Sequence, residues 1–443
     1  MNPGLERIGT IRPRAADQIP GSNWTLGCET LDRDFAVWDE YKEYLVPLGI
    51  KTIRLQSGWA KTEKVRGVYD FAWLDAIIDD ARARGLNILL ETGYGNPIYT
   101  GGGGFDLAGG FPTSGEGLAA WDRWVEAMAK RYKGKVRDWA MWNEPDINKR
   151  HKPEDIAAFN IRTAEIIRRV IPDSRIAGLS LASSSPKLLK SCLQALAEKG
   201  KADLFHWFIY HGYEYNPDTS YPKVEELKAT LANYSSRARM RQGENGCPSE
   251  VTTRFALSKH PWTEVSQAKW DLRRMLGDLG HDVESAVFTI CDFNHKGREI
   301  NRKGLLHATE DKRVDGIKLA YYAVQNTVAV FDSALARVTG PVVSVMSERP
   351  GACFAYRHAA TGAALVVLWD RSATPDDAFV TRPVQVTVKG LTFREPVWVD
   401  LVSGRIYAWP KDRTLRVGEF TLFRDVPFYD APVLIAEKDT VIR

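Results

Sequence analysis

Two glutamates in this sequence stand where an apolar run gives way to turn-forming residues. Glu144 follows the aromatic-rich run 138–142 in the motif Asn-Glu-Pro, and Glu244 lies 100 residues later in Gly-Glu-Asn-Gly. Two carboxyl groups that face each other, one protonated and one ionised, can move protons and attack an electrophilic carbon. Glu250 is a rival to Glu244, but it lies beyond Pro248 in a loop, where we expect it to be solvated.

The elements that must position this pair are eight short apolar runs, each followed by a helical period. Apolar residues recur at helical spacing in each longer segment. The predicted strand and helix pairs are 24–28 with 35–48, 51–55 with 71–84, 87–92 with 118–132, 136–142 with 154–170, 175–181 with 187–199, 204–210 with 224–237, 238–242 with 264–279, and 285–290 with 316–331. Glu144 follows the fourth predicted strand and Glu244 the seventh, so one end of a closed barrel would hold both.

A doubly wound sheet would give the same alternation of strands and helices. The count of eight, the lack of GxGxxG after the first strand and the polar residues after every strand favour the closed form. We therefore predict an α/β fold, a (β/α)8 TIM barrel with a C-terminal β-sandwich domain.

The helical period ends near residue 331, and short β-type runs separated by turn residues follow. A chain of 443 residues is also too long for one ordinary core. We predict a catalytic barrel over 21–331 and a β-sandwich accessory domain over 332–443. Residues 1–20 form an N-terminal segment that could pair with the sandwich. The sandwich is expected to cover one side of the barrel, and a carbohydrate-binding module is the alternative.

Composition limits the partners that need be considered. The net charge is +4, and no Lys/Arg cluster is interleaved with aromatics, so neither nucleic acid nor a membrane is expected as partner. The N-terminus lacks the build of a signal peptide, which predicts a cytoplasmic protein or a chain whose leader has been removed. A homo-oligomer stays open.

Metals and cofactors find little support in the sequence. The five cysteines are scattered without CxxC spacing, and the eight histidines form no HxH or HExxH. The run Gly101–Gly104 lacks the Lys-Ser/Thr ending of a phosphate loop. We expect no metal, no cofactor and free thiols.

The motifs Trp142–Pro145 and Gly243–Gly246 carry a family resemblance. Together with eight βα units they resemble the retaining glycoside hydrolases of clan A, most closely glycoside hydrolase family 39 and its relatives, which pair the barrel with a C-terminal sandwich. The resemblance implies a carbohydrate substrate, with Glu144 as general acid/base and Glu244 as the nucleophile that forms a covalent glycosyl-enzyme. Asn143 would then bind the hydroxyl next to the anomeric carbon.

Further substrate-binding candidates follow the other strands. They are Glu29, Arg54, Trp59, Glu91, Tyr94, His211, Tyr213 and Asp292. The resemblance implies that Arg54 pairs with Glu244 and keeps it ionised. Many clan members end the eighth strand with a Trp beneath the cleaved sugar. Here 289–295 supplies Cys291 and Asp292 instead, which suggests a polar contact through Asp292.

The predicted function is therefore a retaining O-glycosidase acting by double displacement, with the two carboxyl groups ~5–5.5 Å apart. The long loop over 93–117 suggests exo action. One alternative is a non-catalytic sugar-binding barrel. Another is a barrel lyase or aldolase, which would need a Schiff-base lysine or a metal, and no lysine stands at a predicted strand end. Xylosides, galactosides, arabinosides, glucosides and uronides all stay open.

Overall fold

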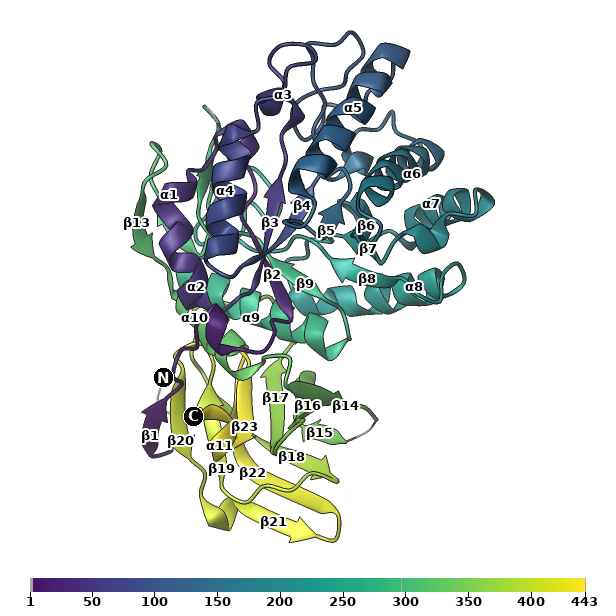
Figure 1. Cartoon of the computed structure of the whole chain (residues 1–443). Helices are drawn as coiled ribbons and strands as arrows, with labels where there is room; N and C mark the ends of the chain where they lie inside the picture. The colour runs from purple at the N-terminus through teal and green to yellow at the C-terminus, as the bar shows by residue number, and fades with distance from the viewer. Residues whose placement is uncertain (1–2, 296, 341, 443) are drawn as a thin grey trace.

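The structure, a computed structural model, describes residues 3–295, 297–340 and 342–442 and consists of a barrel and a sandwich (Figure 1). The barrel strands are β2 (Trp24–Gly27), β3 (Thr52–Gln56), β4 (Asn87–Glu91), β5 (Asp138–Ala140), β6 (Arg175–Leu181), β7 (Trp207–Tyr210), β8 (Arg239–Gln242) and β9 (Ser285–Val287). They pair in parallel from β2 to β8 in chain order, and β9 pairs with β2. Isolated bridges from Arg241 to Glu284 and from Asn245 to Val287 join β8 to β9. The predicted eight-stranded barrel is confirmed.

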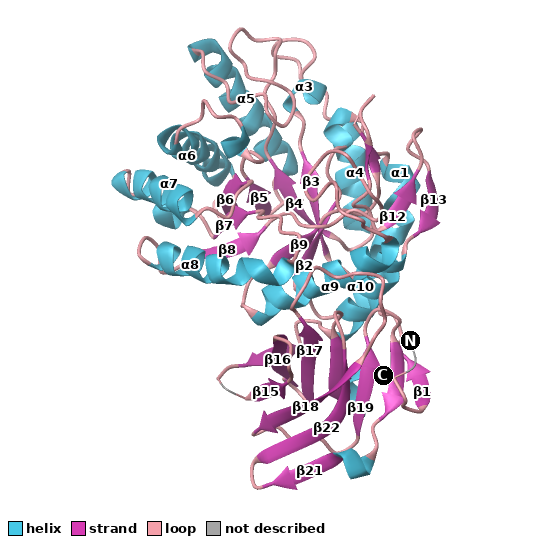
Figure 2. Cartoon of the chain, turned by 180° about the vertical axis from the view of Figure 1, so that it is seen from behind, coloured by secondary structure: helices cyan, strands magenta, loops and turns pink. Residues whose placement is uncertain are grey.

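Helices surround these strands (Figure 2). They are α1 (Trp38–Tyr41), α2 (Leu45–Leu48), α3 (Trp59–Thr62), α4 (Ala72–Ala83), α5 (Gly115–Tyr132), α6 (Pro153–Val170), α7 (Pro186–Glu198), α8 (Tyr221–Ala232), α9 (Glu264–Gly280) and α10 (Leu319–Val330). The single helix predicted over 35–48 is wrong, because a 3-10 turn at Lys42–Tyr44 separates α1 from α2. Pro47 explains the break, since its ring clashes with the carbonyl group four residues earlier and it has no N–H to donate.

The segment between β9 and α10 contains two hairpins that the sequence did not indicate. One pairs β10 (Phe293–Asn294) with β11 (Ile300–Asn301), and the other pairs β12 (Leu306–Ala308) with β13 (Val314–Ile317). Between them the chain returns to the end of β9, where Thr289 N donates to Lys303 O over 3.2 Å and Leu305 N donates to Thr289 O over 2.9 Å. This insertion therefore lies beside the carboxyl end of the barrel.

Two antiparallel sheets make up the C-terminal sandwich. The larger sheet has the order β1-β20-β19-β23-β17-β16-β14, and the smaller has β15-β18-β22-β21. The bounds are β1 (Arg7–Thr10), β14 (Leu335–Val338), β15 (Val343–Met346), β16 (Gly351–His358), β17 (Ala364–Asp370), β18 (Arg382–Lys389), β19 (Pro396–Asp400), β20 (Arg405–Ala408), β21 (Thr414–Val417), β22 (Phe420–Phe428) and β23 (Val433–Glu437), with α11 (Lys438–Val441) at the end. The N-terminal strand β1 thus pairs with β20, far along the chain.

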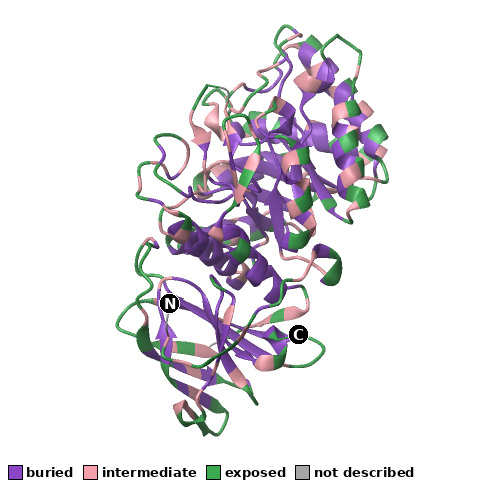
Figure 3. Cartoon of the chain, turned by 90° about the vertical axis from the view of Figure 1, so that its left-hand side faces the viewer, coloured by how far each residue is buried: buried purple, intermediate pink, exposed green. Residues whose placement is uncertain are grey.

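Helices α9 and α10 lie between the barrel and the sandwich and are almost wholly buried (Figure 3). From α9, Lys269 Nζ lies 2.7 Å from Asp430 Oδ1, and Arg273 Nη1 donates to Ala373 O over 2.9 Å. The sandwich therefore packs against the side of the barrel. No helix among the described residues combines the length and apolar character that crossing a bilayer would require.

Candidate active site

The carboxyl ends of the barrel strands surround a cavity of about 540 Å³. Glu29 lies two residues after β2, Glu144 four residues after β5 and Glu244 two residues after β8, and all three line the cavity. Among the described residues, the lining comes from the barrel part of the chain and ends at Lys303, so the sandwich contributes none of it. The ends of parallel strands in a closed barrel meet at one face, which explains why residues so distant in sequence converge.

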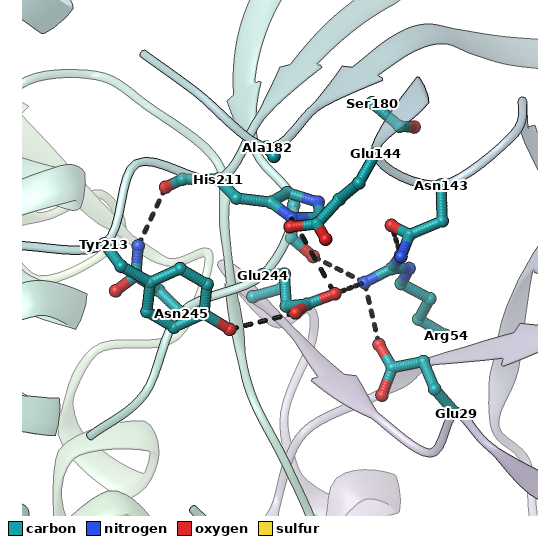
Figure 4. A network of polar contacts seen from close by, with 12 residues as sticks. Glu29, Arg54, Asn143, Glu144, Ser180, Ala182, His211, Tyr213, Glu244 and Asn245 are labelled. Carbon is teal, nitrogen blue, oxygen red and sulfur yellow. Dashed lines mark hydrogen bonds and ion pairs between the residues drawn. The ribbon is translucent and has the colours of Figure 1, made fainter. Parts of the chain in front are cut away.

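Arg54, from the interior of β3, is the centre of a hydrogen-bond network beneath this cavity (Figure 4). Its Nη2 donates to Glu91 Oε2 and to Asn143 Oδ1, each over 2.7 Å. Its Nη1 donates to Glu29 Oε1 and to Glu244 Oε2, each over 2.9 Å. The guanidinium is only 1% exposed, so the fork of donors holds three carboxylates and one amide in fixed positions.

The two oxygens of Glu244 have different partners. Oε2 accepts from Arg54, and Oε1 accepts from the hydroxyl of Tyr213 over 2.9 Å. In Figure 4 these two partners approach the carboxylate from opposite sides. Although burial by itself raises the pKa of Glu244, the charges of His211 and Arg54 and the two donors outweigh it and lower that pKa. Glu244 is therefore held as the anion.

Glu144 is fixed by its backbone and by an imidazole. Its φ is 49°, in the left-handed region that non-glycine residues seldom occupy, and its N–H donates to Ser180 O over 2.8 Å. Ser180 lies where the register of β6 shifts against β7, so an irregular strand meets the irregular turn. His211 Nδ1 lies 2.7 Å from Glu144 Oε1. Burial raises the pKa of Glu144, the nearby charge of Glu244 adds to the increase, and the contact with His211 opposes it.

The two carboxyl groups meet across a short gap. One oxygen of Glu144 and one of Glu244 lie within 4.8 Å of each other, and Nδ1 of His211 lies 2.7 Å from Glu144 Oε1 and 3.8 Å from Glu244 Oε2. In glycosidases the carboxyl groups are ~5–5.5 Å apart when the enzyme retains configuration and ~6.5–9.5 Å apart when it inverts. The gap here matches the shorter class, and the pKa of Glu144 is raised whereas that of Glu244 is lowered.

Comparison with solved structures gives the same architecture. The chain is similar to a family 39 glycoside hydrolase from Bacteroides cellulosilyticus WH2, with a TM-score of 0.64, 16% identity, and coverage of 94% of this chain and 81% of that one. It is also similar to a monomeric beta-xylosidase from Caulobacter crescentus CB15, with a TM-score of 0.61, 17% identity and 97% of each chain covered. The fold is that of the clan A glycoside hydrolases. The predicted resemblance is confirmed at this level.

Sequence comparison adds a match to a shorter stretch of the barrel. A family model for glycoside hydrolase family 42, described as beta-galactosidase, matches residues 29–100. The beta-galactosidase BgaA of Clostridium cellulovorans is 34% identical over 65 residues, which is 14% of this chain and 10% of that protein. The residues matched by the family model include Arg54 and two of its hydrogen-bond partners, Glu29 and Glu91.

Glu29 adds a third carboxyl group to this site. Burial raises its pKa to about 7, with Arg54 opposing the increase and Glu244 adding to it. Its Oε2 is buried and has no hydrogen-bond partner among the described residues. Glu29 as a whole lines the cavity, but this oxygen is enclosed in the wall rather than exposed to the cavity.

The structure brings most of the predicted site residues together. Asn143, Tyr94 and Tyr213 line the cavity, and Arg54, Glu91 and His211 lie just behind the lining. Tyr94 is tied to this group because its hydroxyl accepts from Asn143 Nδ2 over 3.0 Å. Gln56, which donates to Glu91 Oε1 over 3.0 Å, also lines the cavity, although the sequence reasoning missed it.

Two predicted site residues lie elsewhere. Trp59 is turned by α3 into an aromatic cluster, stacked on Trp124 with ring centroids 5.8 Å apart, so it cannot reach a ligand in the cavity. Asp292 is 1% exposed and lies 2.6 Å from Lys318 Nζ, in an ion pair inside the insertion. The polar contact predicted for Asp292 is therefore wrong. Phe288, directly after β9, lines the cavity at the strand end where many clan members place a Trp.

Glu144, His211 and Glu244 are also the described residues whose spacing could hold a metal ion, with one ligand atom from each within 4.8 Å of the others. A cation there would compete with Arg54, which already occupies Oε2 of Glu244. The five cysteines are free thiols, and none of them lines the cavity.

Proposed function

We propose that this chain is a retaining O-glycosidase that acts by double displacement through Glu144 and Glu244. The observation that carries the proposal is the gap of at most 4.8 Å between oxygens of two carboxyl groups whose pKa values are moved in opposite directions. Two titratable groups whose pKa values are shifted in opposite directions can supply the acid and the nucleophile of one reaction.

In the first step Glu244 attacks the anomeric carbon, and the bond to the leaving oxygen breaks as Glu144 transfers its proton to that oxygen. The negative charge of Glu244 is consumed when the new bond forms. That charge is one of the causes of the high pKa of Glu144, so this pKa falls in the intermediate. Glu144 can then take a proton from water, whose oxygen attacks the same carbon and releases Glu244. Two displacements restore the original configuration.

We infer exo action from the way in which loops bound the cavity. Leu107 from the loop after β4, Ser184 from the loop after β6 and Phe255 from the loop after β8 line it on different sides. A second hollow of about 640 Å³ shares Tyr94 and Ile147 with the first and offers room for the leaving group.

A panel of aryl glycosides tests the proposal. It begins with the β-xyloside and the β-galactoside, because the similar proteins carry names of enzymes for these sugars. We expect nitrophenol release, and proton NMR should show that the first product has the configuration of the substrate. Glu144→Gln should reduce kcat by about 10²- to 10⁴-fold, most for poor leaving groups, because those need the proton. Binding without release across the panel would favour the sugar-binding alternative, and a product of inverted configuration would contradict retention.

A further inference from the structure

One buried lysine at the cavity has no acidic partner. Three lysines are buried among the described residues, and two of them are paired: Lys269 lies 2.7 Å from Asp430, and Lys318 lies 2.6 Å from Asp292. Lys303 is only 2% exposed and lines the cavity, yet no carboxylate within the described ranges forms an ion pair with it. Burying an unpaired ammonium is unfavourable, so its place in the cavity needs an explanation.

Backbone hydrogen bonds of the insertion place this lysine beside the cavity. The pairing of Lys303 and Leu305 with Thr289 holds the segment against the end of β9. Asn301, two residues earlier in an extended stretch, lines the same cavity, as expected from the alternation of side chains along such a stretch. Its Oδ1 is buried and has no hydrogen-bond partner among the described residues. Two neighbouring polar side chains thus line the cavity, Lys303 without an ion pair and Asn301 with a buried oxygen that has no partner among the described residues.

Several cations gather in the corner of the cavity around His295 and Lys303, although the charge of Glu244 also reaches Lys303. His295 lines the cavity nearby, and its Nε2 is also buried without a partner within the described part of the chain. Burial and the charges of Arg33, Arg298 and Lys303 lower the pKa of His295 to about 4, so the imidazole is neutral near pH 7. Arg298 lines the adjoining hollow. This corner of the cavity therefore attracts negative charge.

The position of Lys303 relative to Glu244 indicates which part of a sugar it would meet. Its Nζ lies 5.8 Å from the centre of the Tyr213 ring, and Tyr213 bonds Oε1 of Glu244. Arg54 and Asn143 lie on the side of Oε2. If Asn143 binds the hydroxyl next to the anomeric carbon, the ring oxygen of the sugar and the carbon beyond it point to the Tyr213 side.

We propose that the sugar bound at Glu244 carries an anionic substituent on the carbon beyond its ring oxygen, and that Lys303 and Asn301 bind this substituent. The placement rests on the function proposed above. The carboxylate of a uronic acid and the sulfate ester of a hydroxymethyl group share the required chemistry. Lys303 is not needed to balance Glu244, because Arg54 already contacts that carboxylate at 2.9 Å and Lys303 forms no ion pair with it.

Ligand-observed NMR titration of the full chain tests this site without requiring turnover. The probes are D-glucuronate, D-galacturonate and D-glucose 6-sulfate, each compared with the neutral parent sugar. We expect at least one acidic sugar to bind on the order of 10- to 100-fold more tightly than its neutral parent, since hydrogen bonds to charged groups contribute this much. Carboxylate and sulfate are separate arms, and a preference for either supports the proposal.

Variants test whether Lys303 causes the preference for acidic sugars. Lys303→Met should abolish the preference for the acidic sugar and leave the neutral sugar unchanged, whereas Lys303→Arg should keep much of it. Lys190→Met is the matched control, because Lys190 is exposed on α7 outside both hollows and its loss changes only the overall charge. If Lys303→Met does not fold, Lys303→Gln serves the same purpose, and the comparison of ligands on the unmodified chain stands by itself.

The outcomes separate the two proposals. A preference for acidic sugars that depends on Lys303, without cleavage of any aryl glycoside, would support the anion site and contradict the glycosidase. Equal binding of acidic and neutral sugars, a preference for the neutral ones, or a preference that Lys303→Met leaves intact would overturn the anion site whatever the turnover.

Discussion

The cavity has two walls that differ in how far their polar groups are paired in the free protein. The strand-top wall, made of Arg54, Glu91, Asn143 and Glu244, has its charges paired in the free protein, and of its buried side-chain atoms only Nε of Arg54 has no hydrogen-bond partner among the described residues. The insertion wall, made of His295, Asn301 and Lys303, leaves Nε2 of His295 and Oδ1 of Asn301 without hydrogen-bond partners and Lys303 without an ion pair among the described residues.

The difference between the walls corresponds to two tasks of one site, stabilising charge during the reaction and selecting the ligand. Groups that stabilise developing charge work best when they are fixed beforehand, because no reorganisation is then needed during the reaction. Groups that select a ligand work best when they are satisfied only by the correct one, because a wrong ligand leaves them buried and unpaired. On this view the strand-top wall determines the chemistry, and the insertion wall determines which sugar is accepted. The unpaired groups of the insertion wall lower the stability of the fold.

The largest effect is expected at the strand-top wall. Glu244→Ala should lower kcat by at least about 10⁴-fold, since removal of a nucleophile abolishes the covalent route. Sugar binding should persist, and azide, which is small enough to replace the carboxylate, should restore turnover with a product of inverted configuration. Steady-state kinetics and NMR of the azide product measure this. Glu250→Ala is the control, because Glu250 is 57% exposed and pairs with Arg302 outside the cavity. Comparable losses in both variants would contradict the assignment.

The next effect concerns the stability of the same wall. Arg54→Met leaves Glu29, Glu91 and Glu244 without their shared cation, which should lower the free energy of unfolding by about 3–5 kcal/mol. Urea denaturation followed by circular dichroism measures the loss. Lys130→Met should change the stability by less than about 0.5 kcal/mol, because its pair with Glu126 is exposed on a helix. A similarly small change in Arg54→Met would show that the network is not held together by this guanidinium.

The two walls also differ in how far the sequence predicts them. Glu144, Glu244 and Arg54 are found from the sequence because each stands in or directly after an apolar strand, and a barrel brings strand ends together. The local sequence pattern and the closure of the barrel are therefore sufficient to predict the strand-top wall. Lys303 lies 16 residues beyond the end of β9, and backbone pairing to Thr289 returns it to the cavity. No lysine directly follows a barrel strand along the chain, but the fold brings Lys303 beside the end of β9.

The two misplaced candidates have local causes. β9 ends at Val287, so Asp292 belongs to the insertion rather than to the strand end, and Lys318 captures its carboxylate. Trp59 follows β3 closely, but the short helix α3 rotates it away from the cavity and into the packing of Trp121 and Trp124. In both cases the direction of a side chain after the strand depends on contacts with distant segments, which spacing does not encode.

A smaller effect, of opposite sign, is expected at the insertion wall. Lys303→Met should raise the free energy of unfolding by about 1–3 kcal/mol at pH 7, because it removes a buried charge without a partner. Burial lowers the pKa of Lys303 from 10.5 to about 8 in the folded protein. A folded pKa below the unfolded one means that the destabilisation is fully present below about pH 8 and fades as the pH rises toward 10.5. The stability difference between the variant and the parent should therefore shrink over that interval.

Lys318→Met is the matched control for this prediction. Lys318 is as buried as Lys303 but is paired with Asp292, so its removal should destabilise the fold. Chemical denaturation at pH 7 and pH 10 measures both variants. If Lys303→Met loses as much stability as Lys318→Met, then Lys303 has a structural partner, and the contrast between the two walls fails.

The smallest effect is expected at His211, which shares features of both walls. Its Nδ1 contacts Glu144, while its Nε2 is buried without a partner within the described residues. His211 lowers the pKa of Glu144 and that of Glu244, each against the effect of burial. The proposed reaction requires Glu244 ionised, which would set the acid limb of the pH profile, and Glu144 protonated, which would set the alkaline limb. His211→Phe should raise both pKa values and so move both limbs of kcat/KM to higher pH.

The control for this shift is His281→Phe. His281 makes a comparable contact, with Nδ1 2.9 Å from Glu225 Oε1, but it lies at the end of α9 away from the cavity. Its replacement should leave the profile in place. A His211→Phe profile whose limbs move in opposite directions would mean that the imidazole acts on only one carboxyl group. The gap between Glu144 and Glu244 would then have to be explained without a charge shared between them.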